Sequence, residues 1–227
     1  ACDSTNISKI KNIINKTKNS KLIIGYKFGL EFLNSKKGRN FISNLKNEII
    51  FADLKLHDIP NTCVSTIKAI KDLKVNYLTI HISSGLKALL AAKKTSGRIK
   101  LIGVTILTSL DNKALKEIGF NKDVKKLVLH QAKLAAKAKL DAIVCSAQEV
   151  NLVKKVFKKE IITPGIRFDN SKNDQKRIMT PKQAYNNGSD WLVIGRPITR
   201  GNIKKNINNL LDHLNQWSKD WKYVECQ

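Results

Sequence analysis

Short apolar runs alternate along the chain with longer stretches in which apolar residues recur every three or four positions. Runs rich in Ile, Leu and Val predict buried strands, because a strand covered on both faces needs apolar residues without interruption. The intervening stretches predict amphipathic helices; between residues 124 and 139, apolar side chains fall at positions 124, 127, 128, 132, 135 and 138. The predicted strands cover residues 23–29, 49–55, 77–81, 101–107, 142–145, 161–163 and 191–194, with a stub at residues 1–2, and the predicted helices include residues 60–73, 85–94, 124–139 and 147–157.

This alternation predicts the fold class. Strands joined by helical crossovers run parallel, and eight strand–helix units in a chain of 227 residues indicate a closed (β/α)8 barrel, the TIM-barrel fold. The competing fold is an open, doubly wound parallel sheet, but the 11 glycines form no G-x-G-x-x-G motif between a strand and a helix. The length suits one barrel, so we expect residues 1–227 to form a single domain with its functional groups at the carboxyl ends of the strands.

The chain is strongly basic, with 42 Lys and Arg against 18 Asp and Glu and a formal net charge of +24. Such a charge attracts phosphates, which makes a basic nucleic-acid-binding protein one function class to consider. Only six of the cations are Arg, and Asn and Ile are also abundant, which is typical of compositional bias at tolerant surface positions. Aromatic residues, at 6%, supply few stacking platforms for single strands. We therefore favour bias over a nucleic-acid interface.

The remaining composition favours a cytoplasmic protein without a metal. The four cysteines show no C-x-x-C spacing, and Cys63 and Cys145 lie in apolar contexts, as expected for buried thiols in a reducing cytoplasm. The four histidines form no H-x-H or H-E-x-x-H pattern, so no metal site is predicted. The longest apolar runs fall far short of the ~20 residues that a membrane helix needs, so we expect no membrane span.

Charged residues follow several predicted strands at the end where a barrel carries its active site. Asp53 and Lys55 are two residues apart on one strand and share a face, Asp58 follows on the next turn, and Lys27 ends the neighbouring strand. The set predicts an alternating Lys/Asp/Lys/Asp array, in which the lysines keep both carboxylates ionised and one ammonium group can donate a proton. The pattern D-x-K-x-x-D by itself also fits an ordinary surface ion-pair network.

The same stretch, DLKLHDIPNT at residues 53–62, closely resembles the signature of the orotidine 5′-phosphate decarboxylase family in its proteobacterial form. Further segments resemble that family in the same order along nearly the whole chain, which makes the resemblance specific. They are ACD at residues 1–3, KFG at 27–29, VTILTS at 104–109, VCSAQE at 144–149, TPGIR at 163–167, DQKRIMTP at 174–181 and VIGRPIT at 193–199.

The resemblance implies a carboxy-lyase that converts orotidine 5′-phosphate to uridine 5′-phosphate, the last step of de novo pyrimidine biosynthesis, without a cofactor or a metal. Lys55 would protonate C6 of the pyrimidine after carbon dioxide leaves. Asp53 would face the substrate carboxylate, and Lys27 would hold Asp53 and the ribose hydroxyls. Asp58, with Thr62 beside it, would reach across a homodimer interface into the partner's site.

The resemblance also implies which groups bind the nucleotide. Asp3 would hydrogen-bond the ribose, and Thr108 would lie close to the pyrimidine. The 5′-phosphate would be held by Arg167, Gln175, Gly195 and Arg196, with Gln175 on a mobile loop over residues 167–180 whose polar composition suits a lid. Arginine forks, glycine backbone and the loops after strands seven and eight of a barrel are common phosphate-binding features.

Two alternatives stay open at this stage. The lysine strand can also be aligned through residues 22–25, which places Ile23 at the lysine position; we prefer Lys27 because it keeps a lysine at a strand end. A magnesium-dependent phosphosugar decarboxylase or aldolase of the same barrel group shares the D-x-K-x-x-D pattern. The IPNT segment at residues 59–62 and the Gln175 loop favour the nucleotide decarboxylase.

Overall fold

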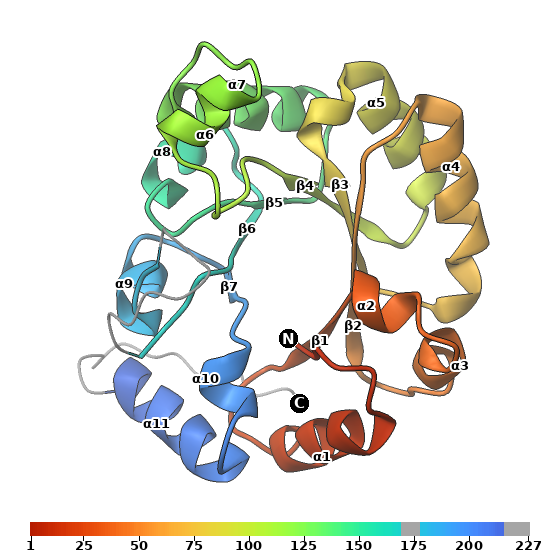
Figure 1. Cartoon of the computed structure of the whole chain (residues 1–227), viewed down its shortest axis with the longest axis vertical. Helices are drawn as coiled ribbons and strands as arrows, with labels where there is room; N and C mark the ends of the chain where they lie inside the picture. Colours follow the sequence, from red (N-terminus) through yellow and green to blue (C-terminus); the bar gives the residue numbers. More distant parts are fainter. Residues whose placement is uncertain (169–177, 216–227) are drawn as a thin grey trace.

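Parallel strands form a ring at the centre of the molecule. The computed structural model describes residues 1–168 and 178–215. In that part of the chain seven strands form one parallel sheet in the order β1-β2-β3-β4-β5-β6-β7, so each strand pairs with its neighbour in sequence. The sheet curls round with its helices outside (Figure 1). The strands are β1 (Gly25–Gly29), β2 (Ile49–Leu56), β3 (Tyr77–His81), β4 (Lys100–Val104), β5 (Ala142–Val144), β6 (Glu160–Thr163) and β7 (Trp191–Leu192).

The eighth strand, predicted at residues 1–2, does not form as a strand, although the segment takes the eighth position in the ring. The backbone N–H of Cys2 donates to the carbonyl of Lys27 in β1 at 2.8 Å, and the nitrogen of Ala1 donates to the carbonyl of Ile194, just after β7, at 2.8 Å. One hydrogen bond on each side is too little for a ladder. The segment nevertheless bridges β7 and β1, which closes the barrel.

The helices confirm the predicted alternation, and the largest differences in length occur at two places. The predicted helix over residues 60–73 ends early and continues as a 3-10 turn, and the one over 147–157 shrinks to a single short helix. The helices are α1 (Ile7–Thr17), α2 (Leu30–Leu33), α3 (Gly38–Ser43), α4 (Pro60–Ala69), α5 (Leu86–Ser96), α6 (Asn112–Glu117), α7 (Val124–Lys137), α8 (Val150–Lys154), α9 (Pro181–Asn186), α10 (Arg196–Thr199) and α11 (Ile203–Asn215), with 3-10 turns η1 (Lys71–Leu73) and η2 (Ile82–Ser84).

Most of the core forms two layers, because successive side chains on a strand point to opposite faces of the sheet. The larger layer lies between the strands and the outer helices and includes Phe28, Leu78 and Leu101. The smaller one fills the inside of the barrel and consists of Phe51, Tyr77, Ile102, Ala142 and Ile162, packed against Trp191. The filled interior leaves the carboxyl ends of the strands as the place for a cavity.

Two chemical features of the described residues accompany this fold. Cys2, Cys63 and Cys145 are buried, and none of the three is in a disulfide. Within residues 1–168 and 178–215, no helix combines the length and the apolar character needed to cross a bilayer.

Candidate active site

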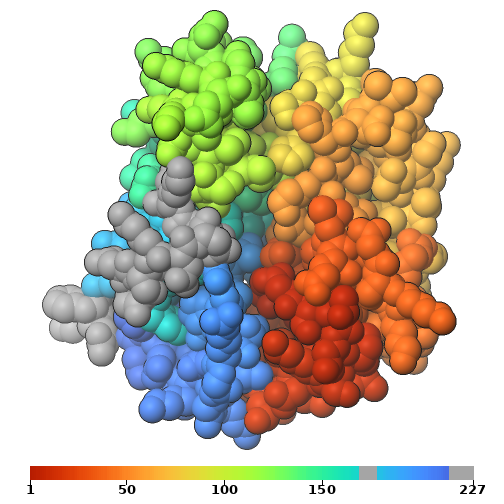
Figure 2. Space-filling model, viewed as in Figure 1, coloured from red at the N-terminus to blue at the C-terminus, as the bar shows by residue number. Residues whose placement is uncertain are grey.

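A cavity of about 520 Å³ lies at the carboxyl ends of the strands and gathers most of the predicted site residues. Its walls come from both ends of the chain: the amino-terminal segment (red) and the α10 region (blue) lie side by side in Figure 2. The predicted residues that line it are Asp3, Lys27, Asp53, Lys55, Thr108, Arg167, Gly195 and Arg196.

Asp53 is the centre of the charged group in this cavity. Its Oδ2 atom lies 2.9 Å from Nζ of Lys55 and 3.2 Å from Nζ of Lys27, so one carboxylate oxygen is shared by two lysines. Lys27 also contacts Oδ1 of Asp3 at 3.5 Å. The Asp53 side chain is only 11% exposed, whereas that of Lys55 is 35% exposed. The predicted Lys27–Asp53–Lys55 arrangement is therefore formed, and Ile23, the alternative to Lys27, is 73% exposed instead.

Burial and ion pairing act in opposite directions on this group. Burial alone would lower the pKa of the Lys27 ammonium, but the carboxylates of Asp53 and Asp3 outweigh it and raise that pKa above its usual value. For Asp53 the two effects have the opposite signs. Burial would raise the pKa of its carboxyl group, but the ammonium groups of Lys27 and Lys55 lower that pKa below the usual value. Asp53 is therefore ionised and Lys27 protonated throughout the neutral range, which gives the cavity a fixed alternation of charge.

Lys55 owes its position to an irregularity in β2. Ala52 pairs with Leu78 and Leu56 pairs with Ile80, so three residues of β2 lie opposite a single residue of β3. Lys55 lies within this bulge and has φ at 48°, in the left-handed backbone region that residues other than glycine rarely adopt. Its backbone N–H donates to Oγ1 of Thr79 at 2.8 Å. Bulges of this kind redirect side chains next to active sites, and here the redirected side chain reaches Asp53.

The segments that follow β6 and β7 add two arginines to the lining of the cavity. Arg167 follows β6, is 8% exposed and donates from Nη1 to the carbonyl of Ile166 at 2.9 Å. Gly195 and Arg196 follow β7, and a Cβ at Gly195 would stand 3.5 Å from Oδ2 of Asp3. This is an ordinary van der Waals distance, so Gly195 lies against the amino-terminal segment without steric need for a glycine.

Sequence reasoning missed several polar residues at or beside the cavity, among them Thr199 in α10. Lys9 and Arg200 line it and are exposed, and Thr79, 1% exposed, contacts Asp53 from β3. Thr79 could have been noticed as a polar residue within an apolar strand. Lys9 and Arg200 carry no such signal, because single cations on an exposed helix or loop are common everywhere in this chain.

Other predicted residues lie outside this cavity or outside the described part of the chain. Asp58 is exposed, and its Oδ1 accepts a hydrogen bond from the backbone N–H of Ile59 at 2.7 Å. Thr62 is exposed in the first turn of α4, and its carbonyl accepts from Oγ1 of Thr66 at 2.9 Å. Gln175 and most of the predicted lid over residues 167–180 lie outside the described residues.

The donor set at the cavity suits an anion better than a metal ion. Among the described residues, no group of three or more His, Cys, Asp or Glu side chains is placed to hold a metal. In the cavity, Lys9, Arg200 and the arginines that follow β6 and β7 add positive charge to the two lysines paired with Asp53. A donor set of this kind can neutralise an anion that carries more than one negative charge.

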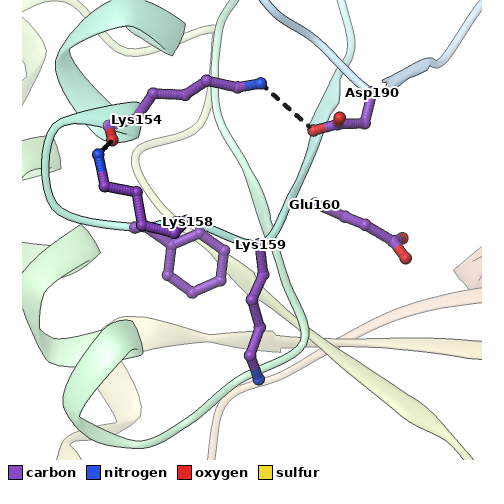
Figure 3. Close-up of a pocket in the computed structure, with 6 residues that line it drawn as sticks. Lys154, Lys158, Lys159, Glu160 and Asp190 are labelled. Atoms are coloured by element: carbon purple, nitrogen blue, oxygen red, sulfur yellow. Dashed lines mark hydrogen bonds and ion pairs between the residues drawn. The ribbon is translucent and has the colours of Figure 1, made fainter.

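A second cavity of about 500 Å³ lies at the opposite end of the strands, where Glu160 begins β6 and Asp190 precedes β7 (Figure 3). Its lysines are already engaged. Lys154 pairs with Asp190 at 3.8 Å, Lys158 donates to the carbonyl of Lys154 at 2.7 Å, and Lys159 donates to the carbonyl of Leu140 at 2.8 Å. In barrels this end serves stability. We therefore assign these residues to the scaffold.

Comparison with known proteins identifies relatives over most of the chain. Residues 1–206 match the model of the family described as "Orotidine 5'-phosphate decarboxylase / HUMPS family". The orotidine 5′-phosphate decarboxylase of Wolbachia pipientis subsp. Culex pipiens is 49% identical over 179 residues, covering 76% of this chain and 79% of that protein. That of Carboxydothermus hydrogenoformans is 41% identical over 211 residues, 87% of either chain.

Solved structures agree with the fold. The crystal structure of the orotidine 5′-phosphate decarboxylase from Lactobacillus acidophilus has a TM-score of 0.80 and 31% sequence identity, covering 94% of this chain and 96% of that one. The decarboxylase from Methanocaldococcus jannaschii, solved in complex with the inhibitor BMP, has a TM-score of 0.75 at 20% identity. These likenesses confirm the predicted TIM barrel.

Proposed function

The chain belongs to the orotidine 5′-phosphate decarboxylase / HUMPS family, and from this premise we propose that it is a carboxy-lyase of pyrimidine biosynthesis, converting orotidine 5′-phosphate to uridine 5′-phosphate. One observation carries the proposal: a buried carboxylate shared by two lysines lines the same cavity as Arg167 and Arg196. A substrate with a carboxylate at one end and a phosphate at the other matches this distribution of charge.

Lys55 supplies the proton that completes the reaction. The bond between C6 and the carboxylate breaks, its electron pair stays on C6, and carbon dioxide leaves. The Lys55 ammonium stabilises the charge that develops at C6 and then donates a proton to it, leaving a neutral amine that solvent reprotonates. Asp53 keeps the ammonium directed at the cavity through the 2.9 Å contact and faces the substrate carboxylate. Lys27 holds Asp53 from the other side at 3.2 Å.

The rest of the cavity binds and orients the nucleotide. Arg167 and Arg196 hold the 5′-phosphate, and Gly195 brings a backbone N–H close to it. Asp3 hydrogen-bonds the ribose beside Lys27, and Thr108 lies against the pyrimidine. Gln175 completes the phosphate site from the lid over residues 167–180. Binding energy from the phosphate, remote from C6, is then available for closure and orientation.

The whole chain, residues 1–227, acts as one domain in the cytoplasm, and two copies complete each other's sites. Asp58 and Thr62 are exposed at the start of α4, beside the apolar side chain of Ile59, which is 66% exposed. A dimer formed through this face would bury the Ile59 side chain. Asp58 reaches across it to the partner's Asp53–Lys55 pair, and Thr62 contacts the partner's nucleotide. The three buried cysteines, none of which is in a disulfide, fit a reducing compartment.

Mixing two inactive variants tests the shared site. Lys55→Ala and Asp58→Ala dimers, unfolded together in equal amounts and refolded, form heterodimers in which one site has both groups. Because half of the dimers are mixed and each has one complete site, about a quarter of the wild-type activity should return. No recovery, with mixed dimers present by native mass spectrometry, would show that Asp58 acts within its own subunit. An Asp58→Ala dimer that is already active on its own would show that Asp58 has no role in the reaction.

Loss of absorbance from orotidine 5′-phosphate tests the reaction itself. The purified chain should consume this substrate in the presence of a chelator and release uridine 5′-phosphate. Turnover of a phosphosugar that stops with the chelator would instead support the magnesium-dependent enzyme that shares the D-x-K-x-x-D pattern. A folded protein that leaves the nucleotide unchanged, yet binds RNA tightly near physiological salt, would support the nucleic-acid-binding alternative.

A further inference from the structure

The bulge in β2 places two functional side chains and removes a regular hydrogen-bond partner at the same point. Asp53 and Lys55 both lie between Ala52 and Leu56, where the register with β3 shifts. Lys55 has φ at 48°. Such a conformation persists only where the surroundings hold it in place. The groups that contact this short segment therefore decide where the two side chains point.

One hydroxyl group, that of Thr79 in β3, contacts both residues. Its Oγ1 accepts a hydrogen bond from the backbone N–H of Lys55 at 2.8 Å and donates its own proton to Oδ1 of Asp53 at 3.1 Å. The direction of both bonds is fixed, because an N–H can only donate and an ionised carboxylate can only accept. Thr79 is 1% exposed, so water does not compete for either bond.

This hydroxyl completes the coordination of the Asp53 carboxylate. Oδ2 forms ion pairs with Lys27 and Lys55, and Oδ1 accepts the hydrogen bond from Thr79. The carboxylate is therefore fixed in rotation as well as in position. The backbone N–H of Lys55 is hydrogen-bonded to the same hydroxyl. One atom, Oγ1 of Thr79, therefore fixes both the backbone that carries the Lys55 side chain and the carboxylate that this side chain contacts.

We propose that Thr79 is a positioning residue for the decarboxylation: its hydroxyl holds the strained bulge so that the Lys55 ammonium and the Asp53 carboxylate meet the substrate at fixed places. The inference rests on the proposed function, in which Lys55 donates the proton and Asp53 faces the substrate carboxylate. Thr79 itself contacts no reacting atom. A shift of about 1 Å in a reacting group can cost on the order of 100-fold in rate.

Replacement of Thr79 by Val removes the hydroxyl and keeps the branched shape. In Thr79→Val we expect kcat to fall by about 10- to 100-fold, while KM and the dissociation constant of uridine 5′-phosphate change by less than about three-fold because the phosphate and ribose contacts remain. The acid limb of the profile of kcat/KM against pH should move to higher pH, since the ionised form of Asp53 loses a hydrogen bond. Thr79→Ser, which keeps the hydroxyl, should retain most of the rate.

Thr17→Val is the matched control. Thr17 is also buried, and its hydroxyl donates to the carbonyl of Ile13 at 2.8 Å, on α1 outside the barrel. Thr17→Val should lower the thermal stability while kcat and the pH profile stay unchanged. If Thr79→Val does not fold, Thr79→Ser and Thr79→Ala form a second pair, and the serine variant should be at least about ten-fold faster.

The outcomes separate this inference from the proposed function. If the wild type decarboxylates the nucleotide, Lys55→Ala does not, and Thr79→Val keeps the wild-type kcat and pH profile, Thr79 has no positioning role. Equal rates for Thr79→Ser and Thr79→Ala would overturn the inference in the same way. If Lys55→Ala remains active, the roles of Lys55 and Asp53 fail first.

Discussion

The two ends of the barrel both carry lysine–carboxylate pairs, but the pairs differ in burial and backbone. At the carboxyl end, Asp53 is 11% exposed and shared by two lysines, one of them in a left-handed conformation within a bulge. At the amino end, Lys154 pairs with Asp190 (Figure 3). These two side chains are 41% and 43% exposed. Lys100 pairs there with Glu160 beside Tyr77, both on regular strands.

The contrast shows which property marks a site. An ion pair by itself does not, because this basic chain forms such pairs at both ends. A buried carboxylate, a strained backbone and an open cavity coincide only at the carboxyl end, among the described residues. Surface pairs contribute little because water competes with them, whereas a buried charge must be paired to be tolerated. The predictions below compare one end with the other.

Loss of the proton donor should give the largest difference between the ends. Lys55→Ala should reduce kcat by at least about 1,000-fold, because it removes both the stabilising charge and the proton source. Uridine 5′-phosphate should still bind, as its phosphate contacts remain. Lys159→Ala, at the amino end, should keep the wild-type rate. Absorbance assays and titration calorimetry measure these effects, and near-normal turnover by Lys55→Ala would exclude it as the donor.

Much of the carboxyl-end cluster was predictable from sequence, and the part that was not depends on irregular backbone. Alternation of apolar runs and helices placed Lys27, Asp53 and Lys55 at neighbouring strand ends, and the structure brings them into contact. The bulge at Lys55 and the hydrogen bonds of Thr79 to Asp53 and Lys55 depend on how β2 and β3 pair. A prediction from hydrophobic periodicity treats this pairing as regular and therefore cannot find them. The prediction of a strand at residues 1–2 was wrong for a related reason, because this two-residue segment bridges β7 and β1 without forming a ladder.

Removal of one member of an ion pair should lower the free energy of unfolding more at the carboxyl end than at the amino end. Asp53→Ala leaves Lys27 and Lys55 without their shared carboxylate, and we expect the free energy of unfolding to fall by about 3 kcal/mol. Lys154→Ala removes an exposed pair, so the loss should stay below about 1 kcal/mol. Urea denaturation at pH 7 measures both. An Asp53→Ala variant as stable as the wild type would mean that the Asp53 carboxylate makes no net contribution to stability.

The contribution of Asp53 to stability should also depend on pH. Its pKa is lowered in the folded state by Lys27 and Lys55, so its contribution is present above the unfolded-state value of about 3.9 and disappears as the pH falls through the lower folded-state value. The difference between the wild type and Asp53→Ala should therefore be constant near neutrality and shrink below about pH 4. A difference that persists in acid would point to packing rather than charge.

The smallest expected effect concerns Lys9 and Arg200, the exposed cations at the rim of the cavity. The double variant Lys9→Ala/Arg200→Ala should raise KM by about five-fold at low salt with little change in kcat, because exposed charges attract the substrate without contacting the reacting atoms. The effect should disappear near about 0.5 M salt, where screening is strong. Lys158→Ala/Lys159→Ala removes the same net charge from the opposite end and is the matched control. An equal rise in KM in both double variants would mean that the net charge of the chain, rather than its placement at the mouth, draws in the substrate.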